Sequence, residues 1–217
     1  MKHLKTKCKP LDDLLGGGIE NKTVTEIYGE AGSGKTNLCL QISRESAING
    51  NKVVYIDTEC VSSLRLKQIC TGYDYDKILT QILFFNPDSL DEQEKMINDS
   101  IEIKDIGLII VDTFNMFYRI MFEEDEKGSS RSLNRQMTNL QLTARKKNIS
   151  VVLAGQVYTA DNNEIKPFAG RGIEHMVKTI IKLEKISMGK RQATIMKHRS
   201  QPEGKKTIFT IAHKGLE

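Results

Sequence analysis

The chain of 217 residues is long enough for one sizeable core, and its 39% hydrophobic and 28% charged residues are typical of a soluble globular protein. No apolar run approaches the length of a membrane span, and no apolar signal segment follows the basic start MKHLKTKCKPLDD, so we expect a cytoplasmic protein. The four cysteines form no C-x-x-C pair, which argues against a zinc or disulfide framework, and the net charge of +4 permits nucleic-acid binding without requiring it.

Up to Gly155, apolar runs alternate with helix-like stretches, which is the pattern of an α/β fold. Several of the apolar runs contain almost no polar residue, which indicates a parallel sheet covered on both faces. Strands are predicted at 23–29, 52–58, 82–86, 107–112 and 149–155. Helices are predicted at 35–49, 62–70, 89–102 and 133–147.

The pattern changes after Gly172, where short apolar runs are separated by the turn sequences SMGK and SQPEGK. Short strands joined by such turns pair antiparallel, so we expect a mostly parallel sheet with a C-terminal antiparallel extension. The strands of this extension are predicted at 175–186, 191–198 and 206–214. Two polar segments, 122–132 and 158–172, are predicted to be loops, and the length of the second favours a functional role.

The segment GEAGSGKT matches the phosphate-loop motif G-x-x-x-x-G-K-[ST] in full, and it follows a predicted strand and opens a predicted helix. Its glycines let backbone N–H groups surround phosphate oxygens, and the helix N-terminus adds a favourable dipole. We expect Lys35 to contact the β- and γ-phosphates and Thr36 to bind Mg²⁺. The predicted phosphate-binding residues are Gly29, Glu30, Ala31, Gly32, Ser33, Gly34, Lys35 and Thr36.

Three further strands end in a polar side chain at the edge where ligands of such sheets bind. LIIVD ends in Asp112, a candidate for the acid that holds Mg²⁺. VVYIDTE ends in Glu59, which either activates the attacking water or is a solvated loop carboxylate. VVLAGQ ends in Gln156, which either senses the γ-phosphate or only forms a hydrogen bond at the strand end.

In this order, the motifs resemble the RecA/RadA recombinase superfamily, and the resemblance covers essentially the whole chain. LDDLLGGGIENKTVTEIYGEAGSGKT, YIDTECVSSLRLKQI and PEGKKTIFTIAHKGLE are similar to archaeal RadA segments, whereas only a short segment precedes LLGGG. A short branch of that family, which lacks the helical N-terminal DNA-binding domain of RadA, is the better match. The resemblance implies a single RecA-like ATPase core over 1–217.

The same resemblance implies a function: an accessory protein of homologous recombination and DNA repair that binds ATP with Mg²⁺ and has weak ATPase activity. It implies no strand exchange by the protein itself. The implied partners are single-stranded or branched DNA, RadA recombinase, a Holliday-junction resolvase and a replicative DNA polymerase. The sequence does not fix the oligomeric state, and a homo-oligomer stays an open alternative.

The resemblance implies three further candidate nucleotide-binding residues. Arg65 either packs on adenine or is a solvated helix arginine. Lys197 and Arg199 point the same way on a late strand, where they either reach a neighbouring subunit's γ-phosphate or extend into solvent.

Basic residues accumulate late in the chain, and they form either a DNA-binding face or a solvated strand edge protected by lysines. They are Lys178, Lys182, Lys185, Lys190, Arg191, Lys197, Arg199, Lys205, Lys206 and Lys214. The loops at 122–132 and 158–172 contain few basic residues, chiefly Arg131, Lys166 and Arg171, which argues against RadA-like DNA binding through them.

Two classes of function remain open: an ATP-modulated recombination accessory, and a non-catalytic module that docks on a recombinase and uses ATP mainly for stability. A small-molecule kinase is disfavoured because FEEDEKGSSRS, with one arginine among several acidic residues, is a poor match to the arginine-rich lid of such kinases.

Overall fold

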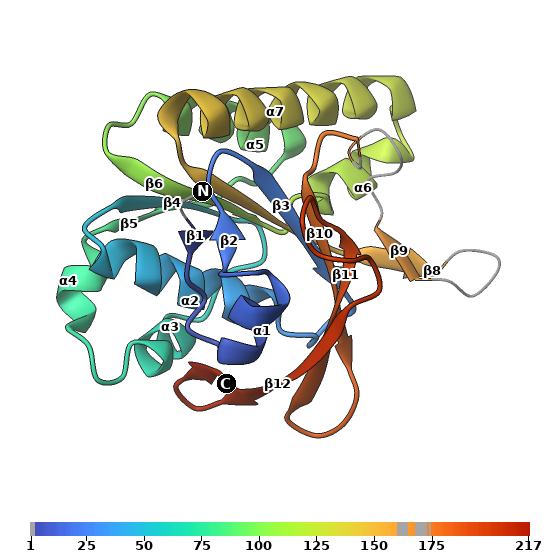
Figure 1. Cartoon of the computed structure of the whole chain (residues 1–217). Helices are drawn as coiled ribbons and strands as arrows, with labels where there is room; N and C mark the ends of the chain where they lie inside the picture. The colour runs from blue at the N-terminus through green and yellow to red at the C-terminus, as the bar shows by residue number, and fades with distance from the viewer. Residues whose placement is uncertain (1–2, 160–164, 168–172, 174) are drawn as a thin grey trace.

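The computed structural model describes residues 3–159, 165–167, 173 and 175–217, and its centre is a nine-stranded sheet (Figure 1). The strands run in the order β13-β12-β11-β10-β3-β7-β6-β4-β5. Strands β3 to β7 and β10 pair parallel, and β10 to β13 pair antiparallel, so the predicted fold class is confirmed. The strands are β3 (Val24–Gly29), β4 (Lys52–Asp57), β5 (Ile82–Phe85), β6 (Ile106–Asp112), β7 (Ser150–Gly155), β10 (Thr179–Lys185), β11 (Lys190–Lys197), β12 (Lys206–Ala212) and β13 (Gly215–Leu216).

Helices cover both faces of this sheet, and each face has its own hydrophobic cluster (Figure 1). The helices on one face are α1 (Lys9–Leu14), α2 (Lys35–Ile48), α3 (Ser63–Ile69) and α4 (Tyr75–Leu79). The other face carries α5 (Leu90–Ile101), α6 (Met116–Phe122) and α7 (Glu126–Lys147). The apolar residues of β6 and β7 are fully buried because helices lie above and below them. Within the described ranges, no helix is both long and apolar enough to cross a membrane.

The chain ends are joined to the second helix. Gln41 of α2 is buried, and its Nε2 donates to Thr6 O at 2.8 Å and to Leu216 O at 3.3 Å. Its Oε1 accepts from Leu216 N at 2.6 Å. One amide therefore satisfies backbone groups from both termini, which brings β13 against the helix that follows the phosphate loop.

The predicted loop at 122–132 is wrong over most of its length, because α7 begins at Glu126. The side chain of Asp125 accepts from Gly128 N at 2.9 Å, so the acidic run caps the helix and complements its dipole. The predicted loop at 158–172 also contains regular structure, since β8 (Val157–Thr159) pairs with β9 (Ile165–Pro167). Helices α1, α4 and α6, and the short pair β1 (His3–Leu4) and β2 (Ile19–Glu20), were not predicted.

Candidate nucleotide-binding site

The phosphate loop lies between β3 and α2, which is the context that its motif requires. Gly29 is restricted by space, because a Cβ there would lie 2.2 Å from the carbonyl oxygen of Leu183 in β10. Gly34 precedes α2 with φ of 104°, and no side chain caps this helix. The N–H groups of the first turn of α2 are therefore left for a ligand at the loop.

Lys35 is buried, and its ammonium group faces the loop. Nζ donates to Gly29 O at 2.8 Å and to Glu30 O at 3.1 Å. Burial lowers the pKa of Lys35 below its ordinary value, while the negative charges of Asp112 and Glu59 act to raise it. The lysine is thus held beside the loop by carbonyl oxygens and has two carboxylates close by.

Asp112 ends β6 and is buried next to the loop. Its Oδ2 accepts from the Tyr55 hydroxyl at 2.7 Å, and its carboxylate also forms a hydrogen bond with Thr36. Burial raises the pKa of the Asp112 carboxyl, and these two hydrogen bonds act in the opposite direction. The structure therefore brings together the two predicted magnesium ligands, Thr36 and Asp112.

Glu59 and Gln156, which lie after β4 and β7, are in direct contact. Nε2 of Gln156 donates to Oε1 of Glu59 at 2.6 Å. The backbone of Gln156 is fixed by Asn115, whose Nδ2 donates to Gln156 O at 2.9 Å and whose Oδ1 accepts from Gln156 N at 2.9 Å. The predicted base and the predicted sensor thus form one hydrogen-bonded unit at the carboxyl edge of the sheet.

The residues present fit an ATP–Mg²⁺ complex. The hydroxyl of Ser33 is buried and has no hydrogen-bond partner within the described chain, so it is available to a phosphate oxygen. Thr36 and Asp112 supply oxygen atoms, the ligands that Mg²⁺ prefers. Among the described residues, no group of three or more His, Cys, Asp or Glu side chains could hold a metal, and Mg²⁺ in nucleotide sites usually relies on few protein ligands plus phosphates.

The sequence assigned no role to three residues that arrange this site: Tyr55 and Asn115, which no motif indicated, and Asp57, which was noted only as a second carboxylate beside Glu59. Oδ1 of Asp57 accepts from Glu59 N at 3.2 Å and its Oδ2 accepts from Val61 N at 2.6 Å, which shapes the turn that carries Glu59. A hydroxyl in the apolar strand KVVYID was the available signal for Tyr55, because a buried tyrosine needs a partner. The partner itself depends on the register of β4 and β6 and cannot be found locally.

Arg65 connects three parts of the molecule. Its Nε donates to Asn37 Oδ1 at 2.6 Å, Nη1 donates to His213 O at 2.8 Å and Nη2 donates to Ala212 O at 2.9 Å. The guanidinium is therefore ordered by α2 and the C-terminal strands, and burial lowers its pKa. These hydrogen bonds rule out the alternative that Arg65 is a solvated helix arginine. The packing of Arg65 on adenine stays a prediction.

Lys197 and Arg199 lie toward the amino-terminal ends of the parallel strands, away from the chain's own phosphate loop. Lys197 pairs with Ile180, which pairs with Glu26, three residues before Gly29 along β3. Nε of Arg199 lies 3.4 Å from the buried carboxylate of Glu20. Neither side chain is therefore next to the loop of its own chain.

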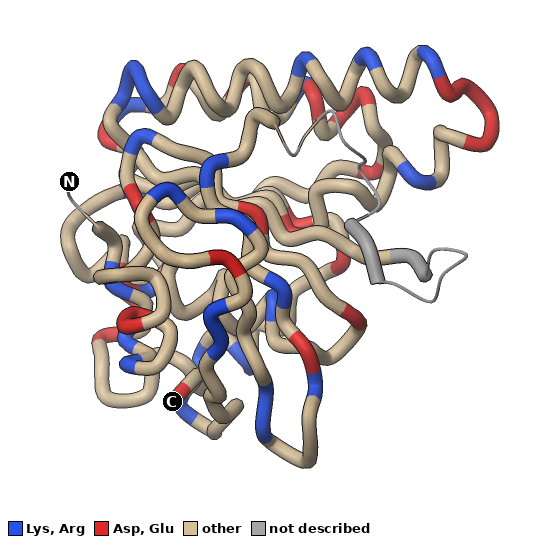
Figure 2. The backbone as a smooth tube through the Cα atoms, turned by 45° about the vertical axis from the view of Figure 1, so that its right-hand side comes forward, with Lys and Arg blue, Asp and Glu red and all other residues tan. Residues whose placement is uncertain are grey.

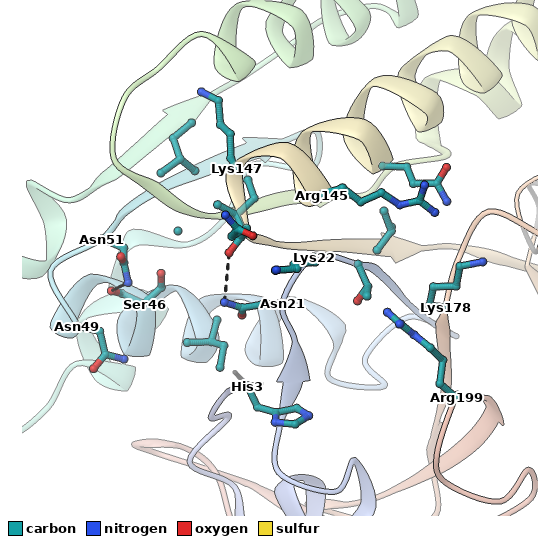
Figure 3. A pocket seen from close by; sticks show the side chains of 18 of the residues that line it. His3, Asn21, Lys22, Ser46, Asn49, Asn51, Arg145, Lys147, Lys178 and Arg199 are labelled. Atoms are coloured by element: carbon teal, nitrogen blue, oxygen red, sulfur yellow. Dashed lines mark hydrogen bonds between the residues drawn. The ribbon is translucent and has the colours of Figure 1, made fainter. Parts of the chain in front are cut away.

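A basic cavity of about 1180 Å³ lies at the opposite, amino-terminal ends of the parallel strands (Figure 3). Its lining contains no acidic residue, several asparagines and the C-terminal ends of α2 and α7. In Figure 2 the C-terminal end of α7 is blue, whereas the acidic turn before α7 is red. Its basic lining residues are His3, Lys22, Arg145, Lys147, Lys178 and Arg199.

The late basic residues do not form the single face that was considered from the sequence. Lys178 and Arg199 line the cavity, whereas Arg191 donates to Gly32 O at 2.8 Å at the phosphate loop. Lys182 forms an ion pair with Glu184 at 2.8 Å, and Lys205 donates to Gln201 Oε1 at 2.8 Å. Of the loop residues considered, Arg171 and the side chain of Lys166 lie outside the described residues.

Comparisons with known proteins agree with this geometry. The Rad51 family model matches residues 1–217. The chain is 46% identical to the DNA repair and recombination protein RadB of Methanococcoides burtonii, over 98% of this chain and 96% of that protein. It is 36% identical to RadB of Thermoplasma acidophilum, over 100% of this chain and 94% of that one. A crystal structure of the RadB recombinase superposes with a TM-score of 0.87 at 34% identity and covers 98% of each chain. The chain therefore belongs to the Rad51 family of RecA-like proteins, within its RadB branch.

Proposed function

We propose that the protein binds ATP with Mg²⁺, hydrolyses it slowly, and acts as a DNA-binding accessory of homologous recombination and DNA repair. One observation carries the nucleotide part: Lys35, Asp112 and the Glu59–Gln156 pair converge at one edge of the sheet. The names of the relatives, which assign them to DNA repair and recombination, support the cellular role.

Each residue of the cluster has a distinct role in this proposal. The loop amides and Lys35 bind the phosphates, and Thr36 and Asp112 supply oxygen ligands to Mg²⁺, which when bound neutralises phosphate charge. Glu59 orients the attacking water and accepts its proton. Gln156 contacts Glu59 directly, so a change at the carboxylate is passed to the segment after β7.

Slow hydrolysis is supported by the environment of Glu59. The side chain is exposed, and one of its carboxylate oxygens already accepts the Gln156 amide at 2.6 Å. A water-activating group works best in a site that excludes bulk water and that frees its acceptor for the reacting water. Rapid turnover would therefore require an additional surface to cover this edge.

The basic cavity is the proposed contact for DNA. Arg199 is paired with the buried Glu20, but Lys22, Arg145, Lys147 and Lys178 line the cavity with no acidic residue in the lining. They create a positive potential that suits phosphate oxygens, and the asparagines add neutral hydrogen-bond donors. Arg145 and Lys147 also lie in the last turn of α7, where they complement the helix dipole. Contacts of this kind bind the phosphate backbone of DNA and do not discriminate between base sequences.

The proposal also includes a role for Lys197 and Arg199 at the nucleotide of another subunit, either a second copy or a RadA subunit. Their distance from the chain's own loop supports an action in trans. Such an action needs subunits stacked head to tail, with the amino edge of one sheet against the carboxyl edge of the next. ATPase assays of the Arg199→Ala variant, alone and mixed with RadA, test it: unchanged hydrolysis in both assays removes the role.

The nucleotide part is tested with a fluorescent ATP analogue, titrated with and without Mg²⁺. Lys35→Ala is expected to weaken binding by about tenfold or more, because a charged hydrogen-bond donor to phosphate is lost. Lys67→Ala, which removes an exposed lysine of α3, is the matched control and should bind as the wild type does. Equal affinity of Lys35→Ala and wild type would refute this site.

The DNA part is tested by the anisotropy of a labelled single strand over a salt series, with and without ATP. We expect an affinity that falls with salt and changes when ATP is added. If ATP alters neither DNA nor partner affinity, the modulation by ATP is wrong.

One observation favours the alternative function, a module that docks on a recombinase. The β10–β11 turn and the adjoining strand β12 expose Met188 at 97%, Ile208 at 54% and Ile186 at 45%. Isolated apolar side chains of this size are common on surfaces, but three on one turn and its adjoining strand favour a protein contact. This alternative predicts that Lys35→Ala leaves recombinase binding intact, whereas Met188→Asp abolishes it.

A further inference from the structure

Arg191, at the start of β11, is a buried arginine that contacts the phosphate loop. Its side chain donates from Nε to Gly32 O at 2.8 Å, and from Nη1 to Lys190 O at 3.0 Å and Ser187 O at 3.3 Å. Only 9% of the residue is exposed. The contacts described for this guanidinium are all to carbonyl oxygens, so its positive charge stays uncancelled beside the loop.

The Gly32 carbonyl determines the shape of the loop. Gly32 has φ of 74°, and nothing lies within 4 Å of the position that a Cβ would take. The loop is therefore not held there by packing. Because a peptide unit is planar, fixing Gly32 O also fixes the following N–H of Ser33, which closes a turn onto Glu30 O at 3.1 Å.

Two cations thus hold three carbonyl groups of one short loop. Lys35 holds Gly29 O and Glu30 O, and Arg191 holds Gly32 O. Lys35 belongs to the motif, but Arg191 comes from the antiparallel extension, 159 residues further along the chain. The nucleotide site is therefore completed by a part of the sheet that the motif does not contain.

A second contact joins the extension to the loop. Strand β12 packs below the start of α2, where a Cβ on Gly34 would lie 3.2 Å from Ile211 Cδ1 and 3.8 Å from Phe209 Cε2. Phe209 is buried and is the register partner of Arg191. The arginine and this apolar pair support the loop from the same side.

We propose that Arg191 is a positioning residue of the phosphate loop: it fixes the Gly32 peptide, whose N–H closes the turn onto Glu30 O, and so keeps the loop in the shape that binds phosphate. It also adds a permanent positive charge beside the loop. This inference rests on the proposed binding of ATP. Arg191 need not touch the nucleotide, because it acts through the Gly32 carbonyl.

The test compares Arg191→Met, which keeps length but removes all donors, with Arg191→Lys, which keeps the charge and one donor. Arg135→Met is the matched control, since Arg135 is an exposed arginine of α7 that pairs with Glu94 on the other face of the sheet. Two quantities are measured: the dissociation constants of ATP and ADP, and the hydrogen exchange of the amides of residues 29–36 in the nucleotide-free protein.

Arg191→Met is expected to raise both dissociation constants by about ten- to hundredfold, the usual effect of losing a hydrogen bond to a charged group. Loop amides should exchange faster while the amides of β6 and β7 keep their protection, and Arg191→Lys should restore part of both properties. A purely structural arginine would instead change the exchange of the core strands.

Dissociation constants within twofold of wild type, or unchanged loop exchange, in a folded Arg191→Met protein would overturn the inference. If that variant does not fold, the same two measurements on Arg191→Lys decide. If the wild type itself does not bind ATP, the proposed function fails, and the exchange of the loop amides alone then decides the role of Arg191.

Discussion

The hydrogen bond between Tyr55 and Asp112 gives the sharpest single test of the metal side of the site. Both side chains are buried, and the hydroxyl donates to Oδ2 of Asp112 at 2.7 Å. In Tyr55→Phe the carboxylate loses a donor that water cannot replace at this depth. A buried hydrogen bond to a charged group contributes about 2 kcal/mol, so we expect the free energy of unfolding to fall by about that amount near neutral pH.

The pH dependence of this loss follows from the pKa of Asp112. Burial already raises that pKa, and the Tyr55 bond opposes the rise, so Tyr55→Phe should raise the pKa further. For a carboxyl whose folded pKa is raised, the folded state binds more protons, and stability falls as pH rises from the unfolded pKa through the folded one. The difference between variant and wild type should therefore be larger at about pH 8 than at about pH 5.

Urea unfolding across this pH range measures the stability, and a titration of Mg²⁺ in the presence of ATP measures the metal affinity, whose pH midpoint should move upward in the variant. Tyr75→Phe is the control, because Tyr75 packs against the same face and its hydroxyl has no hydrogen-bond partner in the described part of the chain. A loss below about 0.5 kcal/mol, together with an unchanged midpoint, would show that Tyr55 does not hold Asp112.

Three further predictions concern the rest of the molecule. Gln41→Leu should lower the free energy of unfolding by about 3 kcal/mol in urea, because the N–H and C=O of Leu216 lose their buried partner; a change below about 1 kcal/mol contradicts this. His198 accepts two backbone N–H groups at Nδ1, and burial lowers its pKa, so stability should be complete above about pH 6.5 and decline as pH falls below it. Thermal unfolding of His198→Asn, which keeps an acceptor but cannot titrate, should lack that decline. The double variant Lys22→Gln, Lys178→Gln should weaken DNA binding and reduce the magnitude of the log–log salt slope by about two, whereas an unchanged slope would exclude the cavity as the phosphate contact.

The phosphate loop and the start of the helix after it could be predicted, because their conformation depends on the residues of the motif itself. The glycines and the helix start at Gly29–Thr36 depend on neighbouring residues only. The meeting of Asp112, Glu59 and Gln156 could also be predicted, because each follows a parallel strand and the carboxyl ends of parallel strands lie at one edge of the sheet. Their partners could not be predicted, because Tyr55 meets Asp112 through strand register.

The errors have equally specific causes. The prediction of a loop at 122–132 is wrong because the acidic run, through the side chain of Asp125, caps the start of α7 rather than interrupting it. A single face of late basic residues was one of the two alternatives considered, and it fails because their strands extend from the phosphate loop to the far end of the sheet. Arg191 and Arg199 belong to the same segment but lie at opposite ends of it.

The positions of Arg191 and Arg199 on one segment lead to a testable hypothesis, that nucleotide binding at the loop is coupled to DNA binding at the basic cavity. Strand β11 spans eight residues, and the seven from Arg191 at the loop to Lys197 near the basic cavity cover about 20 Å. β11 pairs with β10 up to Lys197, with a register shift at Ile180/Ile181, and its register with β12 covers Lys190–Thr194. The hypothesis is that a loop shift on nucleotide binding displaces this strand and, through it, the cavity end. Any such coupling is reciprocal: the factor by which ATP changes the DNA dissociation constant must equal the factor by which DNA changes that of ATP. If β11 transmits the change, Arg191→Met should bring both factors toward one, whereas a coupling that persists in this variant must take a different route through the fold.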